Sequence, residues 1–587
     1  MLRRGFLLVL VLVLALAAAM LLSDFAKAQP VATCSGANVP VASELNSPQG
    51  LVANTCVPSW VLPPAANGVD LYFANGLYWL ADATGALTNS RLTNETCFTS
   101  GGNLVQVGPN QNCVTDLGVE AQEGRTNGIK NNSFSGAALG VVGSGGALPT
   151  GWSCSCIGLT ANVTALGVVG GMPNITINIS GTTTGQYFSL HFGAYSDVSA
   201  VYGQTWSSSS WESLAGSNIS NVVASGLWLQ DTGSGGAGLA STVQGTAPGT
   251  LTNSVINNTI VPSGTLYEYP GFYMNFSAAS GQTFNGNITF AVPQLERNAI
   301  PASVASAVTG GANGSGGSGY LINDTGTITA TNGGTAATYK VTGVSGTTVT
   351  TVSITAAGSY TVDATHGLPA SPAATVATSG VGTGLTLTPT PTNNAAQAFA
   401  TTPILTTNGA LARSPDSITL PVAACSGSGS LYAIGIPAAP AGYLQYQSLA
   451  QIDDGTSNNR LDFSRAPNGY IVANSTVGGV GVNVTASAGP VAAGVSGKTS
   501  LFATASTLKT VYNNGTINSG AVTGFPAGMT TLRIGIANGG QAPFNGTISR
   551  VAVACGQSLL LSEAPANNND MFAANDNVPW LKAVGVF

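Results

Sequence analysis

The stretch Asn174-Ile-Thr-Ile-Asn-Ile-Ser180 places an isoleucine at every second position between polar residues. Side chains alternate between the two faces of a strand, so this pattern is typical of a β-strand with one buried and one solvated face. The same alternation returns at Phe188, Leu190 and Phe192, and in the ranges 288–292 and 532–536. We find no convincing amphipathic helix longer than about three turns. The sequence therefore predicts an all-β fold built from several antiparallel β-sandwiches or jelly rolls.

Composition removes several classes of protein. The 587 residues include 16 Lys and Arg against 22 Asp and Glu, which makes 6% charged side chains and a net charge of −6. An ordinary globular protein carries about 25%. Nucleic-acid binding needs a basic surface patch, and no run rich in Lys or Arg follows the N-terminus, so we expect no nucleic-acid partner. The few Glu and Lys residues also disfavour a coiled coil or helical bundle.

The N-terminus has the pattern of an export signal. A basic start at Arg3 and Arg4 precedes the uncharged run Phe6–Leu22, and small residues at Ala26 and Ala28 suit signal-peptidase cleavage after residue 28. A retained membrane anchor is the alternative, although the run is short for spanning a bilayer. We expect residues 1–28 to be removed and the mature chain to be secreted, to the cell surface, the exterior or the periplasm, with no membrane partner afterwards.

All eight cysteines follow this segment, in a compartment that permits disulfides. Metal binding is the rival interpretation, but there is no Cys-x-x-Cys pair and only two histidines, which makes a zinc site improbable. Cys154 and Cys156 are the one close pair. Spacing does not fix connectivity, and the pairings we predict are Cys34–Cys56, Cys97–Cys113 and Cys425–Cys555.

Composition shifts also divide the mature chain. Gly/Ser-rich residues 309–319 and Pro/Thr-rich residues 389–394 have the composition of linkers. The predicted units are 29–127, a Cys-containing β region; 128–305, a strand-rich block with four of the seven tryptophans; 306–395, a small Gly/Thr-rich β module with linkers; 396–562, a second sandwich; and 563–587, a tail.

One segment carries a resemblance to a known family. Leu117-Gly-Val-Glu120 is followed by Glu123-Gly-Arg-Thr-Asn127. This resembles the G-L-x-x-E-x-x-R-T-N signature of bacteriophage tail-fibre and head-spike-fibre proteins, where it opens a jelly roll like those of carbohydrate-binding modules. Residues 424–555 look like a concanavalin A-like, or laminin-G-like, sandwich through the ranges 453–460 and 544–548. Residues 316–386 look like a small β module of phage tail proteins.

The resemblance implies adhesion or a structural role in a surface appendage. A virion fibre or spike component is one alternative, and it is expected to form trimers. Virion proteins normally lack a signal peptide, so the export signal favours a cellular relative that binds cell-surface or extracellular glycans. Fold alone does not fix function.

Glycan binding has the best chemical case among the candidate sites. Sugar rings pack on aromatic side chains while Asn, Asp and Gln bond the hydroxyls. Aromatic residues gather in a Ser-, Asn- and Gly-rich setting between positions 187 and 228. For each tryptophan, burial in a sandwich core is the more ordinary explanation. The candidate glycan-binding residues are Trp206, Trp211, Trp228, Tyr187 and Tyr195.

A structural calcium ion is the one cofactor considered. Asp453, Asp454, Asn458 and Asn459 put four oxygen-bearing side chains into one loop, and carboxylate and carbonyl oxygens are what Ca²⁺ prefers. The alternative is a hairpin turn, because Asp, Asn and Gly are turn formers.

Catalysis is not indicated. The glucanases with a concanavalin A-like fold carry a Glu-x-Asp-x-x-Glu strand motif that this sequence lacks, and glycoside hydrolysis needs two carboxylates about the scissile bond. A catalytic triad would have to use His191 or His366, and neither is placed like a catalytic base. We expect an exported, non-enzymatic adhesin or surface protein, with a glycan-cleaving enzyme as the remaining alternative.

Overall fold

The computed structural model describes residues 38–40, 56–58, 68–74, 77–81, 87–257, 261–297, 307–328, 335–358, 373–392, 401–439, 446–513, 515–540 and 542–556, and residues 360, 362, 368 and 558. Within these ranges the chain forms strands β1 to β41 and three short 3-10 segments, and no α-helix. The predicted all-β, multidomain sandwich fold is confirmed. No helix in this part of the chain has the length and apolar character to cross a membrane.

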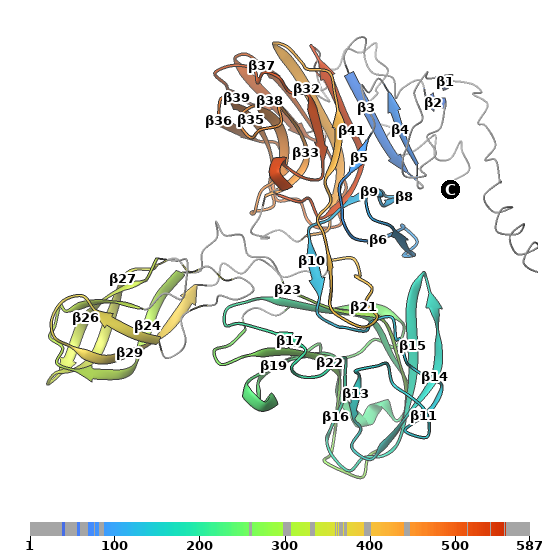
Figure 1. The fold of residues 1–587 in the computed structure, drawn as a ribbon, viewed down its shortest axis with the longest axis vertical. Coiled ribbons are helices and arrows are strands. Elements are labelled where there is room, and N and C mark those ends of the chain that lie inside the picture. The colour runs from blue at the N-terminus through green and yellow to red at the C-terminus, as the bar shows by residue number, and fades with distance from the viewer. Residues whose placement is uncertain are drawn as a thin grey trace, which may run out of the picture.

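The jelly roll packs two sheets against each other (Figure 1). Ile175, Ile177 and Ile179 are fully buried on its larger sheet and face a core that includes Phe188 and Leu190, as the alternation predicts. The larger sheet has the order β12 (Gly145–Gly146), β11 (Gly140–Val142), β14 (Leu159–Val169), β15 (Met172–Thr182), β23 (Thr283–Arg297), β10 (Arg125–Asn127), β30 (Leu411–Arg413), with β18 (Trp206–Ser217) joining β23 to β21 (Thr252–Asn257). The smaller sheet has the order β13 (Ser153–Ser155), β16 (Tyr187–His191), β22 (Tyr267–Phe276), β19 (Val222–Thr232), β20 (Gly238–Val243), with β17 (Val198–Ser199) on β22.

The C-terminal sandwich also has two sheets around one core. One has the order β39 (Asn518–Ala521), β38 (Thr507–Tyr512), β37 (Gly497–Thr504), β32 (Ser428–Pro437), β41 (Gly546–Cys555), β3 (Gly68–Ala74), β4 (Leu77–Ala81), with β9 (Gly118–Ala121) on β41 and β8 (Val114–Thr115) on β9. The other has the order β36 (Val480–Thr485), β35 (Ile471–Val477), β34 (Arg460–Arg465), β33 (Gln447–Asp453), β40 (Thr531–Ile534), β31 (Ile418–Pro421), β5 (Thr88–Asn89).

Residues 29–127, which the sequence sets apart as a region of their own, contribute strands to this sandwich. β3 pairs with β41, β5 pairs with β31, and β9 pairs with β41. Figure 1 shows the blue β3 and β4 beside the orange-red β41. The pairing satisfies backbone groups that an open sheet edge would leave bare. The sandwich is therefore assembled from two ends of the chain, and the jelly roll and small module are inserted between them.

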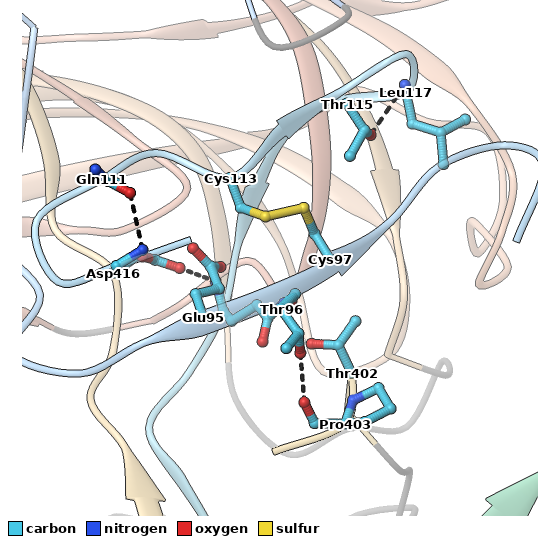
Figure 2. The surroundings of a disulfide bond; sticks show 12 residues. Glu95, Thr96, Cys97, Gln111, Cys113, Thr115, Leu117, Thr402, Pro403 and Asp416 are labelled. Carbon is cyan, nitrogen blue, oxygen red and sulfur yellow. Dashed lines mark hydrogen bonds between the residues drawn. A yellow bond between two sulfur atoms is a disulfide. The ribbon is translucent and has the colours of Figure 1, made fainter. Parts of the chain in front are cut away.

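A buried ion cluster fixes the N-terminal segment to the second half of the chain. The Arg91 guanidinium is fully buried between Glu95 and Asp416, with Asp416 Oδ1 at 2.6 Å from Nη1. Nearby, β6 (Glu95–Phe98) and β7 (Leu104–Val107) form a hairpin. Figure 2 shows the Cys97–Cys113 disulfide there and the Thr96 hydroxyl donating to the Pro403 carbonyl.

Two of the three predicted disulfides are confirmed, Cys97–Cys113 and Cys425–Cys555. Cys154 and Cys156, the close pair, bond to each other. The predicted Cys34–Cys56 pair lies outside the described side chains, although β1 (Asn38–Pro40) and β2 (Cys56–Pro58) pair as strands.

Most of the residues predicted as linkers within 306–395 lie in strands. Residues 309–318 lie in β24 (Ala307–Ser318), which pairs with β29 (Thr383–Thr392). Glycine permits this close approach, because a Cβ on Gly317 would lie 2.4 Å from the Thr383 carbonyl oxygen. The module is one sheet with the order β24, β29, β28 (Ala373–Ala377), β25 (Thr325–Ile328), β26 (Thr338–Ser345), β27 (Thr348–Ala356).

Candidate functional site

The smaller jelly-roll sheet turns one face to the core and the other outward. On β16, Phe188 and Leu190 are fully buried, whereas Tyr187, directly before Phe188, is 56% exposed. On β22, Phe272 and Met274 face the core in the same way. Because side chains alternate along a strand, the residues between these apolar positions share the outward face.

Register then brings aromatic side chains from three strands together. Gly271 of β22 lies opposite both His191 of β16 and Trp228 of β19. A Cβ on Gly271 would lie 3.2 Å from Trp228 Cε3 and 2.5 Å from the Leu190 carbonyl oxygen. The glycine therefore leaves the room that the indole of Trp228 occupies.

We call the resulting cluster of five rings the aromatic face; its members are Tyr187, His191, Trp228, Tyr269 and Tyr273. Trp228 lies at its centre, with ring centroids 5.8 Å from Tyr269 and 6.4 Å from Tyr273. His191 stacks on Tyr269 at 4.3 Å, and Tyr187 stacks on Tyr273 at 6.0 Å. Trp228 itself is 8% exposed, so the ring area open to solvent comes mainly from Tyr187, which is 56% exposed, and from the half-buried His191, Tyr269 and Tyr273.

The aromatic face is electrically neutral at pH 7. Burial lowers the pKa of His191 to about 4, so its imidazole is uncharged, and Nε2 lies 3.0 Å from the Ser189 hydroxyl. Burial also raises the pKa values of Tyr269 and Tyr273, so both phenols keep their protons. None of the outward-facing residues described on β13, β16, β19, β20 and β22 carries a charge. The surface offers ring faces and hydroxyl groups.

The structure separates the predicted glycan-binding residues. Trp228 and Tyr187 belong to the aromatic face, and Tyr195, 39% exposed, packs edge-on against Tyr267 in the same part of the sheet. Trp206 lies in the core, the ordinary explanation, with Nε1 donating to Gln204 Oε1 at 3.3 Å. Trp211 lies on the opposite sheet, where its ring contacts Phe98.

Three members of the aromatic face were missed by the sequence analysis. Tyr269 and Tyr273 are in β22, where polar or aromatic residues alternate with buried ones from Tyr267 to Asn275. That alternation is the signal that could have found them. His191 was weighed only as a catalytic base.

The loop predicted to hold calcium has its carboxylates engaged. Asp453 accepts hydrogen bonds from Arg533 Nε and Gln451 Nε2, each at 2.7 Å. Asp454 accepts from Thr456 and Asn459 across the turn. Asn458 is exposed beside them. Among the described residues no group of three His, Cys, Asp or Glu side chains is placed to hold a metal. Calcium at this loop stays a prediction.

The outward face of the seven-stranded sheet holds a concavity of about 620 Å³, which we call the polar groove. Tyr446, Arg460, Asp462 and Asn474 are among its lining residues. Burial raises the pKa of Asp462, whose carboxylate accepts from Arg460 Nε at 3.0 Å, Asn474 Nδ2 at 2.9 Å and Ser464 at 3.1 Å. Most polar groups here are already paired.

Comparison with known proteins finds no matching family model and no matching curated protein. Solved structures match at low identity. The carbohydrate-binding module CBM40 of Ruminococcus gnavus IT-sialidase, bound to α2,3-sialyllactose, is 18% identical over 26% of this chain and 95% of its own, with a TM-score of 0.21. The galectin LEC-6 of Caenorhabditis elegans is 17% identical over 24% of this chain and 90% of its own, with a TM-score of 0.18.

Domains LG4–5 of the mouse laminin α1 chain are 11% identical over 68% of this chain and 93% of their own, with a TM-score of 0.19. These values are too low to carry a ligand over to this chain. The predicted relation to phage fibre proteins stays a prediction.

Proposed function

We propose that this chain is a glycan-binding protein and that the aromatic face of the jelly roll holds the sugar. The observation that carries the proposal is the continuous set of rings around Trp228 on an outward sheet face. One side of a pyranose ring presents C–H groups, which pack on aromatic rings, while its hydroxyls bond polar side chains around them. Ser189 and the phenols of Tyr269 and Tyr273 supply such groups.

The charge of the face selects the class of glycan. A carboxylate- or sulfate-bearing sugar is held best by arginine, which forms paired hydrogen bonds with an anion. The five residues of the aromatic face are uncharged, and the carboxylate that acts on Tyr269 from beside it, Asp197, is paired with Lys130 at 2.6 Å. The preferred ligand is therefore a neutral glycan. A sialic acid or sulfate group added to this glycan should not increase its affinity.

The protein acts as an exported adhesin without catalysis in this proposal. Cleavage of a glycosidic bond needs two carboxyl groups beside the sugar. The carboxyl groups of this sheet, Asp231 and Glu268, point inward and are 4% and 0% exposed. A sugar on the aromatic face is thus bound away from them.

The test is glycan-array binding followed by titration calorimetry with the best neutral glycan, using the mature chain and a Tyr273→Ala variant. Losing one stacked ring removes about 1–2 kcal/mol, so affinity should fall about 5- to 30-fold. Tyr446→Ala is the matched control, because Tyr446 is an exposed tyrosine of the polar groove.

An unchanged glycan affinity in Tyr273→Ala would show that the sugar binds outside the aromatic face. A loss of affinity in Tyr446→Ala would show that it binds in the polar groove. Release of sugars from the array would contradict the non-enzymatic part of the proposal. Absence of any binding would leave the sandwiches as structural spacers.

A further inference from the structure

The disulfides in the described part of the chain differ in how open they are to a reagent. Cys97 and Cys113 are fully buried, and Cys425 is 5% exposed. Cys154 and Cys156 are both half-buried, and both line a groove of about 810 Å³. Thiol–disulfide exchange requires a thiolate to reach a sulfur atom, so access decides which disulfide reacts first. The Cys154–Cys156 bond is therefore the one that we expect to react first with a thiol from solution.

We call this concavity the edge groove, because strands from the edges of both jelly-roll sheets line it. β13, which contains Cys154, is the edge strand of the smaller sheet, and β12 is the edge strand of the larger sheet within the described residues. Val142, Leu148 and Trp152 supply apolar parts of the lining. An edge strand has peptide groups that no neighbouring strand uses, and an extended peptide can pair with them. The groove thus combines an accessible disulfide with a place for an extended peptide.

Stability gives little reason for this disulfide. Only Ser155 separates its two cysteines, so the bond removes little conformational freedom from the unfolded chain. β13 is held in the sheet by its pairing with β16, where Cys154 lies opposite Leu190. The jelly roll can therefore keep this sheet edge when the disulfide is opened.

The edge groove favours an uncharged partner. None of its described lining residues carries a charge. Lys130 precedes Asn131, whose carbonyl accepts from Trp152 Nε1, and its ammonium group is paired with Asp197 at 2.6 Å. Because the described lining holds no carboxylate, an approaching thiolate meets no like charge there.

We propose that Cys154–Cys156 is a reactive disulfide that oxidises two cysteine thiols of an extended, uncharged peptide segment seated in the edge groove. A thiolate of the peptide attacks one sulfur, the bond between Cys154 and Cys156 breaks, and the other sulfur leaves as a thiolate and takes up a proton. The second peptide thiolate then attacks the peptide sulfur of this mixed disulfide. That step closes the peptide disulfide and leaves Cys154 and Cys156 as thiols.

Two electrons and two protons pass from the peptide to the chain in this exchange. One turnover needs no other oxidant, because the Cys154–Cys156 bond is itself reduced. A low-molecular-weight disulfide such as oxidised glutathione then restores the bond and is converted to two molecules of the reduced thiol.

The test incubates the mature chain with a reduced, uncharged synthetic peptide that carries two cysteines, and in parallel with dithiothreitol. Alkylation and mass spectrometry of proteolytic fragments then measure the thiol content at each cysteine. We expect one peptide disulfide per chain and new thiols at Cys154 and Cys156, while Cys97–Cys113 stays oxidised over the same time.

Two results would overturn the proposal. If Cys154–Cys156 opens no faster than Cys97–Cys113 with either reagent, the bond is not reactive. If dithiothreitol opens it and the peptide does not, the groove does not seat a peptide substrate.

A matched pair of variants locates the exchange. Val141 of β11 lines the groove and is 39% exposed, whereas Val255 of β21 is 38% exposed and is absent from the described lining. Both positions should accept a tyrosine because neither is buried, and circular dichroism checks that the variants fold. Val141→Tyr places a ring in the groove and should slow reduction by the peptide about tenfold, and Val255→Tyr should keep the wild-type rate. An unchanged rate in Val141→Tyr would contradict the groove as the peptide site.

Discussion

The jelly roll and the C-terminal sandwich each turn one sheet outward, and the two faces carry opposite kinds of side chain. The jelly-roll face is built from rings around Trp228. The other face carries a row of polar residues set by register, Asn483, Asn474, Asp462, Gln451 and Arg533. In that row Asp462, Gln451 and Arg533 already bond to neighbouring side chains.

This difference shows why polar residues do not by themselves mark a binding surface. A ligand on the rings removes apolar area from water and breaks few existing bonds. A ligand in the polar groove would have to replace hydrogen bonds that the side chains already make with each other. Binding capacity lies where groups have unused interactions, as on the aromatic face.

The two sandwiches also differ in how the chain builds them. The jelly roll is nearly continuous, from β10 to β23, whereas the C-terminal sandwich joins β3–β5, β8 and β9 to β31–β41 across two inserted modules. Contacts between distant segments carry a larger entropy of closure in the unfolded chain. The cross-links of the C-terminal sandwich should therefore contribute more stability than those of the jelly roll.

The largest effect expected is from the disulfides. Cys425–Cys555 closes 130 residues, so replacing both cysteines with serine should lower the free energy of unfolding of the C-terminal sandwich by about 5 kcal/mol in the chain-entropy model. Cys154–Cys156 closes two, and its serine variant should lose about 1 kcal/mol. Urea unfolding followed by circular dichroism measures both. Equal losses of stability in the two variants would contradict the expected difference between the two sandwiches.

Ion pairs are expected to show the same contrast between the two sandwiches, with a slightly smaller loss of stability. Arg91→Met leaves Glu95 and Asp416 buried without their cation, which should cost about 3–5 kcal/mol of stability. Lys130→Met breaks a jelly-roll pair in which Lys130 is 45% exposed, and the loss should stay below about 1 kcal/mol. The denaturant midpoints of the two variants measure these losses of stability. If Arg91→Met leaves the stability nearly unchanged, the N-terminal segment is held by strand pairing alone.

The sequence predicted the strands well and the assembly poorly. Alternation at Ile175, Ile177 and Ile179 is a local property, and their burial follows directly from it. The pairing of β5 with β31 joins residues about 330 positions apart, and no local pattern encodes which edge a short strand will extend. The glycines of β24 likewise have the composition of a linker, although their small size is what lets that strand approach β29.

The site was predictable in part for the same reason. Trp228 and Tyr187 are recognisable from residue type, but their surroundings depend on register across β16, β22 and β19. Tyr273 contacts the rings of both Tyr187 and Trp228 only because β22 places it next to them.

The next largest effect on stability is expected from the titration of a buried glutamate in the jelly roll. Burial raises the pKa of Glu212 to about 7, above its ordinary value of 4.5. The folded state therefore binds this proton more tightly than the unfolded state, and the wild type loses stability as pH rises from about 4.5 to 7. Glu212→Gln should match wild type near pH 4 and exceed it by about 3 kcal/mol at pH 8.

Tryptophan fluorescence during urea unfolding measures this difference mainly in the jelly roll, because four of the seven tryptophans, Trp152, Trp206, Trp211 and Trp228, are located there. The informative quantity is the difference between the two proteins at each pH, since other buried acids such as Glu120 also contribute. A difference that does not change with pH would show that Glu212 is ionised in the folded protein.

The smallest effect expected is the sharpest test of the two faces. Asp462→Asn keeps the shape of the side chain and removes its charge, and its carboxylate bonds only Arg460, Ser464 and Asn474 among the described residues. If the sugar lies on the aromatic face, neutral-glycan affinity measured by calorimetry should stay within about twofold, which is under 0.5 kcal/mol. A tenfold loss would reverse the comparison, because it would show that the ligand displaces Asp462's internal partners and that the polar groove is the binding surface.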